Sequence, residues 1–243
     1  VFVPSKVKGI GFQQLDNQYE GIDVRGKIVL TERGGPDGVL DAMRAGALAH
    51  IHMWPSSEDV IHEMISTSVW GTPTPESAER IPTIPSTSIN HESGEYLREL
   101  CAKGPVRVRL NAFSDTRWAK EKMVVATVPG SVEPEKYFLV GGHLDSWYVG
   151  TTDNATGNAA MLELARVLNR QRSKLRRTVK VGWWVGHSYG RYAGSTWYCD
   201  TFFNDLRKNC VGYMDIDSPG VKNATLYDQI TCMTENWHIA ESA

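Results

Sequence analysis

Hydrophobic and polar positions divide the chain into two sections that differ in the length of their predicted elements. In the first section, short apolar runs typical of strands alternate with short helical patterns. The segment 66–85 within this section is rich in Pro, Thr and Ser, which predicts a surface loop. The predicted strands are residues 24–30, 48–53, 86–89 and 106–113, and the predicted helices are residues 39–46 and 90–102.

The second section begins after a polar, hinge-like segment at 114–122, and its elements are longer. Nearly continuous apolar strands alternate here with helices, which indicates a sheet covered on both faces. The predicted strands are residues 123–128, 137–142, 178–185 and 211–216, and the predicted helices are residues 154–170 and 195–208. We therefore predict an α/β protein with two domains, residues 1–114 and 115–243, of which the second is an α/β sandwich.

Composition narrows the class of protein but not its compartment. The chain has 243 residues, 41% of them hydrophobic, and a net charge of −2, which is ordinary for a globular protein and offers no field that attracts nucleic acid. It contains neither the roughly 18 to 20 consecutive apolar residues of a membrane span nor a signal-peptide pattern. Its four cysteines are too widely spaced to predict a disulfide framework, so the localisation is left open.

Candidate metal ligands follow three of the predicted strands. His143 comes after strand 137–142, His187 after strand 178–185 and Asp217 after strand 211–216. Because ligand sites in open α/β sheets lie at the carboxyl ends of the strands, we expect these side chains to meet. Imidazole nitrogen and carboxylate oxygen are the ligands of a zinc ion or a similar divalent ion.

Two aspartates complete this pattern. Asp145, two residues after His143, is expected to accept the second imidazole N–H and so fix the tautomer of that ligand. Asp153 opens the helix in TTDNATG, where it can bind one metal or bridge two, although a plain helix N-cap explains it as well. The other two residues also have structural alternatives to metal binding. His143 can be a buried His paired with Asp145, and Asp217 can be a turn residue. The combination favours a metal site more than any single residue does.

At these residues the sequence resembles the zinc aminopeptidase family that includes secreted bacterial aminopeptidases, glutamate carboxypeptidase II and the transferrin receptor. The resemblance covers about residues 118–220 and rests on HLDSW, TTDNATG and DIDSPG. It implies a zinc-peptidase-like α/β sandwich with a mixed sheet, and one or two zinc ions held by His143, Asp153 and Asp217. A peptide or other amide substrate is implied with them.

The first section is similar to the protease-associated domain that members of this family often carry. The similarity lies in GKIVLTERG, AMRAGALAHIHM and IPTIPSTSIN. It implies a β-rich lid or binding module, with a shortened opening portion and without catalytic residues of its own.

The sequence departs from the family pattern at its centre. Where the family has a Glu-Glu pair, a general base followed by a metal ligand, this chain has His187 and Ser188, and one extra residue before Gly194. His187 has three possible roles, which the sequence leaves open: a metal ligand, a general base, or a structural His in a site that binds no metal. The family's last His ligand comes later than Ala243, so we expect the given sequence to be a fragment of a longer domain.

Residues around this departure are candidates for other roles. GHSYG loosely matches the G-x-S-x-G pattern of nucleophilic serines, but the acid and His that Ser188 would need are already grouped as ligands. Arg191 and Tyr192 are candidates to bind a substrate carboxylate or stabilise an oxyanion, and helix packing is the alternative. Trp147 is a candidate wall of a pocket for an apolar side chain, and core packing is its alternative.

The sequence thus predicts a metal-dependent hydrolase of peptide or other amide bonds, with Asp145 and His187 as catalytic residues. The alternative is a receptor-like or scaffold homologue that keeps the fold without catalysis, as the transferrin receptor does. The resemblance also makes a homodimer a possible assembly.

Overall fold

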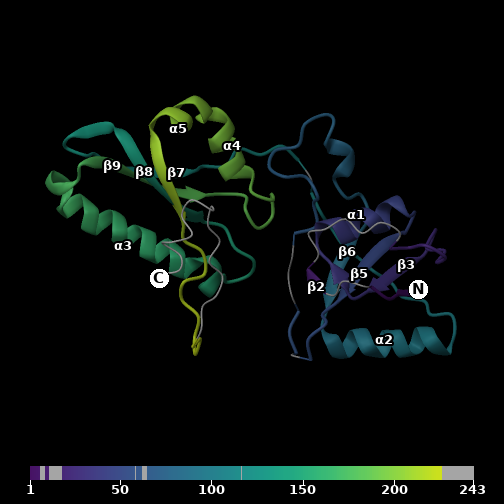
Figure 1. The fold of residues 1–243 in the computed structure, drawn as a ribbon. Helices are drawn as coiled ribbons and strands as arrows, with labels where there is room; N and C mark the ends of the chain where they lie inside the picture. The colour runs from purple at the N-terminus through teal and green to yellow at the C-terminus, as the bar shows by residue number, and fades with distance from the viewer. Residues whose placement is uncertain (6–8, 11–17, 58, 62–64, 116, 226–243) are drawn as a thin grey trace.

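The computed structural model of the chain describes residues 1–5, 9–10, 18–57, 59–61, 65–115 and 117–225. It contains two four-stranded sheets, one in each section, and they lie side by side (Figure 1). Each sheet carries helices, so the chain is an α/β protein as predicted. The domain boundary near residue 114 stays a prediction. Among the described residues, no helix combines the length and hydrophobicity that crossing a bilayer requires.

The sheet of the first section is wholly parallel, with strand order β1-β3-β5-β6. Its strands are β1 (Phe2–Val3), β3 (Ile28–Thr31), β5 (Ala49–Met53) and β6 (Ser86–Ile89). A second, two-stranded sheet pairs β2 (Gly9–Ile10) with β4 (Arg33–Gly34), and the helices are α1 (Pro36–Arg44) and α2 (His91–Lys103). These elements confirm the predicted alternation of short strands and helices.

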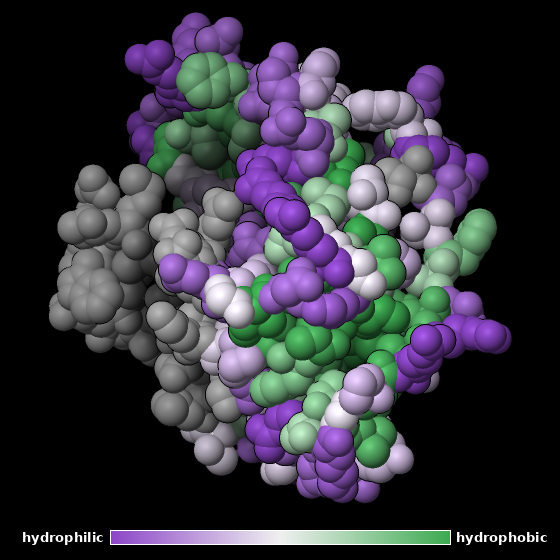
Figure 2. Space-filling model, turned by 90° about the vertical axis from the view of Figure 1, so that its right-hand side faces the viewer, coloured by the Kyte–Doolittle hydropathy of each residue, from purple (hydrophilic) through white to green (hydrophobic). Residues whose placement is uncertain are grey.

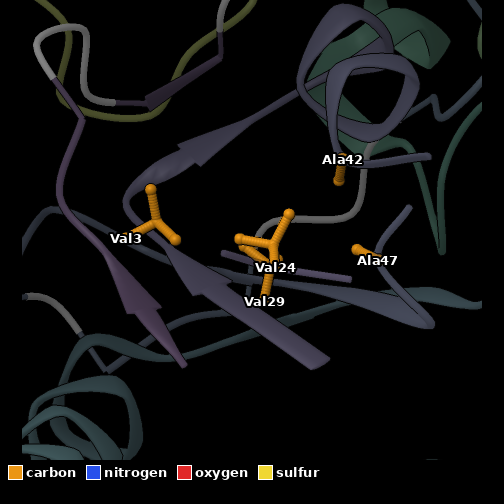
Figure 3. Packing of buried hydrophobic residues seen from close by; sticks show 5 residues of the cluster. All are labelled: Val3, Val24, Val29, Ala42 and Ala47. Atoms are coloured by element: carbon orange, nitrogen blue, oxygen red, sulfur yellow. The ribbon is translucent and has the colours of Figure 1, made fainter. Parts of the chain in front are cut away.

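Alternate residues of β3 fill two separate cores in the first section. Val29 packs with Val3 and with Ala42 of α1, in a cluster of small apolar side chains (Figure 3). The neighbouring Leu30 faces the other way and packs with residues that include Leu97 of α2. This separation follows from the pleat of a strand, which points successive side chains to opposite faces.

The sheet of the second section is mixed, with strand order β10-β8-β9-β7. Its strands are β7 (Val124–Val128), β8 (Glu133–His143), β9 (Arg177–Trp184) and β10 (Cys210–Asp215). Strand β8 pairs in parallel with both β9 and β10, whereas β7 runs antiparallel to β9. The helices are α3 (Gly157–Arg170), α4 (Ala193–Thr201) and α5 (Phe203–Asn209).

Both faces of strand β8 are covered, as predicted. Tyr137 and Leu139 pack with Tyr198 of α4 on one face, and Val140 packs with Met161 of α3 on the other. In Figure 1, α3 accordingly lies on the opposite side of the sheet from α4 and α5. Burial on both faces fixes the register of β8 and therefore the place where it ends, at His143.

Strand β10 does not match the expected buried strand. Val211, Tyr213 and Met214 are each about half exposed, with fractions of 50%, 51% and 51%. Within the described part of the chain, β10 pairs with β8 alone and is an edge strand. The apolar run at 211–216 predicted the strand correctly but not its neighbours.

Two other predictions were wrong. The alternating segment 106–113 forms no strand; Val106 and Val108 instead line a groove of about 890 Å³ beside α2. The groove covers only the beginning of this segment, and Phe113 at its end is 96% exposed, so the alternation does not correspond to a buried face. The single helix predicted at 195–208 is interrupted at Phe202, whose backbone leaves helical geometry while its ring packs on Tyr198, 4.8 Å between centroids.

Hydrophobic side chains gather in a patch on the first section, bordered by hydrophilic ones (Figure 2). The groove beside α2 includes apolar residues of both the sheet and the helix, among them Phe2, Leu30 and Leu97. This section therefore has an incompletely covered core on the side of α2.

A pair of glycines gives Trp184 its place on the second sheet. Gly141 of β8 and Gly182 of β9 are register partners, and the indole lies over both of them. A Cβ atom at Gly182 would lie 2.3 Å from Cη2 of Trp184, far inside van der Waals contact. The absence of two side chains is what makes room for this ring.

We expect Gly182→Ala to lower the free energy of unfolding by about 1–3 kcal/mol, the usual cost of overpacking a core. Urea denaturation measures this change. In a Trp184→Leu background, which lacks the indole, the same substitution should cost clearly less. Equal losses in the two backgrounds would show that the ring does not set the constraint.

Candidate metal centre

Three parallel strands of the second sheet end at the same edge, and each ends at a candidate ligand or shortly before one. Strand β8 ends at His143, β9 ends three residues before His187, and β10 ends two residues before Asp217. The carboxyl ends of β8, β9 and β10 lie together because these strands are adjacent and parallel. The sequence-based expectation that these side chains meet is correct.

The His143 imidazole lies at the middle of the cluster. Its Nε2 atom is 2.6 Å from Oδ1 of Asp153 and 3.3 Å from Oδ1 of Asp217. The His187 ring stacks on the His143 ring, with 3.9 Å between centroids and 13° between planes. Each of His143, His187 and Asp217 offers a ligand atom within 4.8 Å of the others. The structure thus brings all four predicted ligands together.

The donor atoms at the centre of this cluster fit a divalent ion. His143 Nε2 and Asp153 Oδ1 are both buried, and despite their proximity neither makes an aligned hydrogen bond among the described residues. Nδ1 of His143 lies 2.6 Å from the carbonyl oxygen of Asp145, to which it donates. Nε2 is therefore the ring atom that faces the carboxylates and can bind a metal once it releases its proton, and nitrogen and oxygen donors in this mixture suit zinc.

Asp153 belongs to an irregular turn rather than to the helix that follows it. The turn η2 (Thr151–Thr156) precedes α3, and Asp153 and Asn154 have non-helical backbone angles within it. No side-chain hydrogen bond from Asp153 caps the helix; its carboxylate faces His143 instead. The N-cap alternative for Asp153 is therefore wrong.

Asp145 acts on a different partner from the one predicted. The prediction assigned its carboxylate to the His143 imidazole, but the backbone carbonyl of Asp145 takes that role. The carboxylate instead accepts the backbone N–H groups of His187 at 3.0 Å and Ser188 at 2.7 Å. Two residues of separation bring the main chain of Asp145, rather than its side chain, to the ring. Asp145 therefore fixes the loop that carries His187.

Sequence reasoning missed Asn154, which holds the strand ends together. Its side chain is completely buried, and its amide donates to the carbonyl of Ile216, after β10, at 2.8 Å. Its Oδ1 atom accepts the backbone N–H groups of Gly157 in α3 and of Ser218, both at 3.1 Å. A buried Asn in this position satisfies backbone groups that would otherwise be unpaired. The signal was present in TTDNATG, where an Asn precedes a helix rich in small residues.

The two histidines titrate in opposite directions. Burial disfavours the charged form of His143, but the carboxylates of Asp153 and Asp217 outweigh it and raise its pKa to about 10. Burial, together with the charge on the neighbouring His143, lowers the pKa of His187. At neutral pH, the structure therefore holds a proton on His143 and leaves His187 neutral.

The remaining candidates lie around His187 but not all of them face a substrate. Ser188 is 2% exposed, and its Oγ atom is 3.3 Å from Nδ1 of His187. Trp147 donates its indole N–H to the carbonyl of Ser188 at 2.7 Å, and the Tyr192 ring meets the His187 ring edge to face, with 4.7 Å between centroids. Burial argues against Ser188 as a nucleophile, whereas substrate contacts of Trp147 and Tyr192 stay predictions.

The Arg191 side chain has its interaction partners within the protein. Its side chain is buried, its Nη1 atom donates to the carbonyl of Thr67 at 3.3 Å, and its guanidinium lies over the Trp70 ring, 4.7 Å from the centroid. Substrate binding by Arg191 stays a prediction, and in this structure its guanidinium contacts Thr67 and Trp70 instead.

The second section is similar to proteins of known family. Residues 123–240 match the model of Peptidase family M28. Aminopeptidase NAALADL1 of Rattus norvegicus is 31% identical over 128 residues, which cover 51% of this chain and 17% of that protein. A glutamate carboxypeptidase 2 homolog of Caenorhabditis elegans is 31% identical over 115 residues, covering 46% of this chain and 15% of that protein. The chain thus spans less than a fifth of the length of these relatives.

Solved structures share the fold over most of the chain. A zinc aminopeptidase from Bacillus subtilis aligns with a TM-score of 0.58 at 22% identity, over 90% of this chain and 49% of that one. An aminopeptidase from Aneurinibacillus sp. strain AM-1 aligns with a TM-score of 0.57 at 23% identity, over 92% of this chain and 51% of that one. The family match, the sequence relatives and the shared fold agree with one another: through residues 123–240, this chain is similar to peptidase family M28.

Proposed function

We propose that the second section binds a divalent metal ion, zinc in the first instance, and serves the hydrolysis of peptide or other amide bonds. The observation that carries this proposal is the convergence of Asp153 and Asp217 on the unpaired Nε2 side of His143. The match of residues 123–240 to a peptidase family supports the reaction class. When bound, such an ion acts as a Lewis acid toward an amide carbonyl and toward the attacking water.

We assign His187 to the metal, as a ligand beside His143, Asp153 and Asp217. Its lowered pKa leaves the imidazole neutral at pH 7, which is the form that binds metal. Its ring stacks on that of His143, and its donor atom is close to those of His143 and Asp217. Ser188, which stands where the family pattern has its second Glu, is too weak a ligand to complete a second position, so we propose a single ion.

The other residues of the site would hold these ligands rather than react. The Asp145 carboxylate fixes the backbone of His187 and Ser188, and the Asp145 carbonyl holds the proton of His143 at Nδ1. Asn154 ties the end of β10 to the start of α3. Tyr192 and Trp147, which flank His187, are the side chains proposed to contact a substrate.

One observation favours a second candidate function. His187 and Ser188 replace a Glu-Glu pair whose first member is the general base of the family pattern, and general-base catalysis typically contributes about 10²–10⁴ in rate. A homologue that keeps the metal scaffold without hydrolysis, as a receptor or scaffold, is consistent with this replacement. For the first section, we propose the role of a protease-associated lid, on the strength of the motifs GKIVLTERG and IPTIPSTSIN.

The purified chain should bind close to one equivalent of Zn²⁺ or Co²⁺, and His143→Ala should abolish this binding because it removes the central ligand. His91→Ala is the matched control, since His91 lies on α2 of the first section and its ring contacts the Trp54 carbonyl. Metal analysis after gel filtration measures the content. Less than a tenth of an equivalent after exposure to zinc, cobalt and manganese would refute the metal-dependent function.

His187→Ala separates the possible roles of this residue. If His187 is a ligand, its loss should weaken metal affinity by more than the roughly 10- to 100-fold that loss of an outer-shell partner costs. Competition with a chromophoric chelator measures the affinity, and hydrolysis of aminoacyl and N-acyl amide substrates is assayed in parallel. Full metal affinity with lost hydrolysis would instead identify a base. Full affinity with full hydrolysis would remove His187 from the mechanism.

Metal affinity should rise with pH because the metal and the proton compete for Nε2 of His143. With the pKa of His143 raised to about 10, the imidazole is protonated at neutral pH and must release that proton when metal binds. Affinity should therefore increase by about tenfold for each pH unit between pH 6 and 8. Calorimetric titration in buffers of different ionisation enthalpy should report release of one proton, and binding without proton release would contradict this protonation state.

A further inference from the structure

The two sections meet next to the proposed metal ligands. The segment 67–71 of the first section lies against residues 191–196, which follow His187. The backbone N–H of Gly71 donates to the carbonyl of Arg191 at 2.7 Å, and Arg191 donates to the carbonyl of Thr67. The contact is close enough that a Cβ atom at Gly71 would lie 2.2 Å from Oγ1 of Thr196.

A continuous series of rings leads from this contact to the site. Trp70 stacks on Tyr192, with 4.7 Å between centroids and 29° between planes. Tyr192 then meets the His187 ring edge to face at 4.7 Å and 71°, and His187 stacks on His143 at 3.9 Å and 13°. Three ring contacts therefore connect Trp70 to the His143 imidazole, although Trp70 belongs to the other section.

The segment that carries Tyr192 needs an external support. Arg191 and Tyr192 both have left-handed backbone conformations, with φ of 44° and 67°, which are strained for residues with a side chain. Such conformations persist when their surroundings over-determine them. Here the surroundings include the Trp70 ring, which lies against the Arg191 guanidinium and stacks on the Tyr192 ring.

We infer that Trp70 is a positioning residue for the metal centre: by stacking on Tyr192 and Arg191, it sets the orientation of the His187 imidazole against His143. This inference rests on the proposed function at one point, which is that the oriented imidazole binds a metal ion. Trp70 is 57% exposed, so its ring is not a core side chain, and packing of the first section alone does not account for its contacts. The first section thereby contributes to the site without supplying a ligand.

The test compares Trp70→Ala with Trp70→Phe, which keeps a ring for Tyr192 to stack on. Tyr96→Ala is the matched control, because Tyr96 is an aromatic residue of the same section, 63% exposed, on α2. The complete 243-residue chain is used, and circular dichroism checks that each variant is folded. Two readouts are recorded: Co²⁺ affinity, and the Hε1 proton resonance of His187 in metal-free protein, identified by its loss in His187→Ala.

We expect Trp70→Ala to weaken Co²⁺ binding by about tenfold, the lower end of the loss typical for an outer-shell partner. It should also move the Hε1 resonance of His187. Trp70→Phe should restore both, and Tyr96→Ala should change neither. In a His187→Ala background, Trp70→Ala should weaken Co²⁺ binding no further, because its effect passes through that ring.

The outcomes separate this inference from the proposed function. If the wild-type chain binds no Co²⁺ but Trp70→Ala still moves the His187 resonance and Trp70→Phe does not, the metal function fails and the positioning role stands. If Co²⁺ binds and Trp70→Ala matches Tyr96→Ala in affinity and resonance, the positioning role is overturned. A Trp70→Ala effect of undiminished size in the His187→Ala background would overturn it as well.

Discussion

One buried amide, that of Asn154, is the interaction on which the geometry of the site depends. It connects the turn after β8, the end of β10 and the start of α3, three places that are far apart in the chain. Each strand could end in a flexible loop of its own, and the candidate ligands would then occupy a broad distribution of positions. Because the amide is fully buried, leaving any of its partners unpaired is costly. The strand ends are therefore held as a single unit.

Asp145 gives the same kind of support from the other side of the cluster. Its carboxylate accepts two successive backbone N–H groups, so the loop after β9 is fixed through its main chain. The identities of His187 and Ser188 do not enter into these two hydrogen bonds. Such a scaffold tolerates replacement of the residues it carries. The two side chains at 187 and 188 can therefore change without loss of the hydrogen bonds that fix this loop.

The sequence predicted the features that depend on local pattern. Alternation and apolar runs located β8 and β9, and the strand-end rule grouped His143, His187 and Asp217 before any distance was known. It could not predict which atoms of Asp145 act, because main chain and side chain lie at the same sequence separation from His143. Nor could it predict that Arg191 is buried against Trp70. That contact joins residues more than a hundred positions apart, and no periodic pattern in the sequence indicates it.

The contact between Trp70 and the loop after His187 has an evolutionary consequence. This loop carries Arg191 and Tyr192, both in left-handed backbone conformations, before α4 begins at Ala193. The first section contacts this loop in three ways. The Arg191 guanidinium donates to the carbonyl of Thr67, and Trp70 stacks on Tyr192. The absence of a side chain at Gly71 leaves room for Thr196. The two sections are therefore not freely interchangeable modules: recombination with a relative would separate a loop from the surface it fits, so the two are expected to be inherited as a pair.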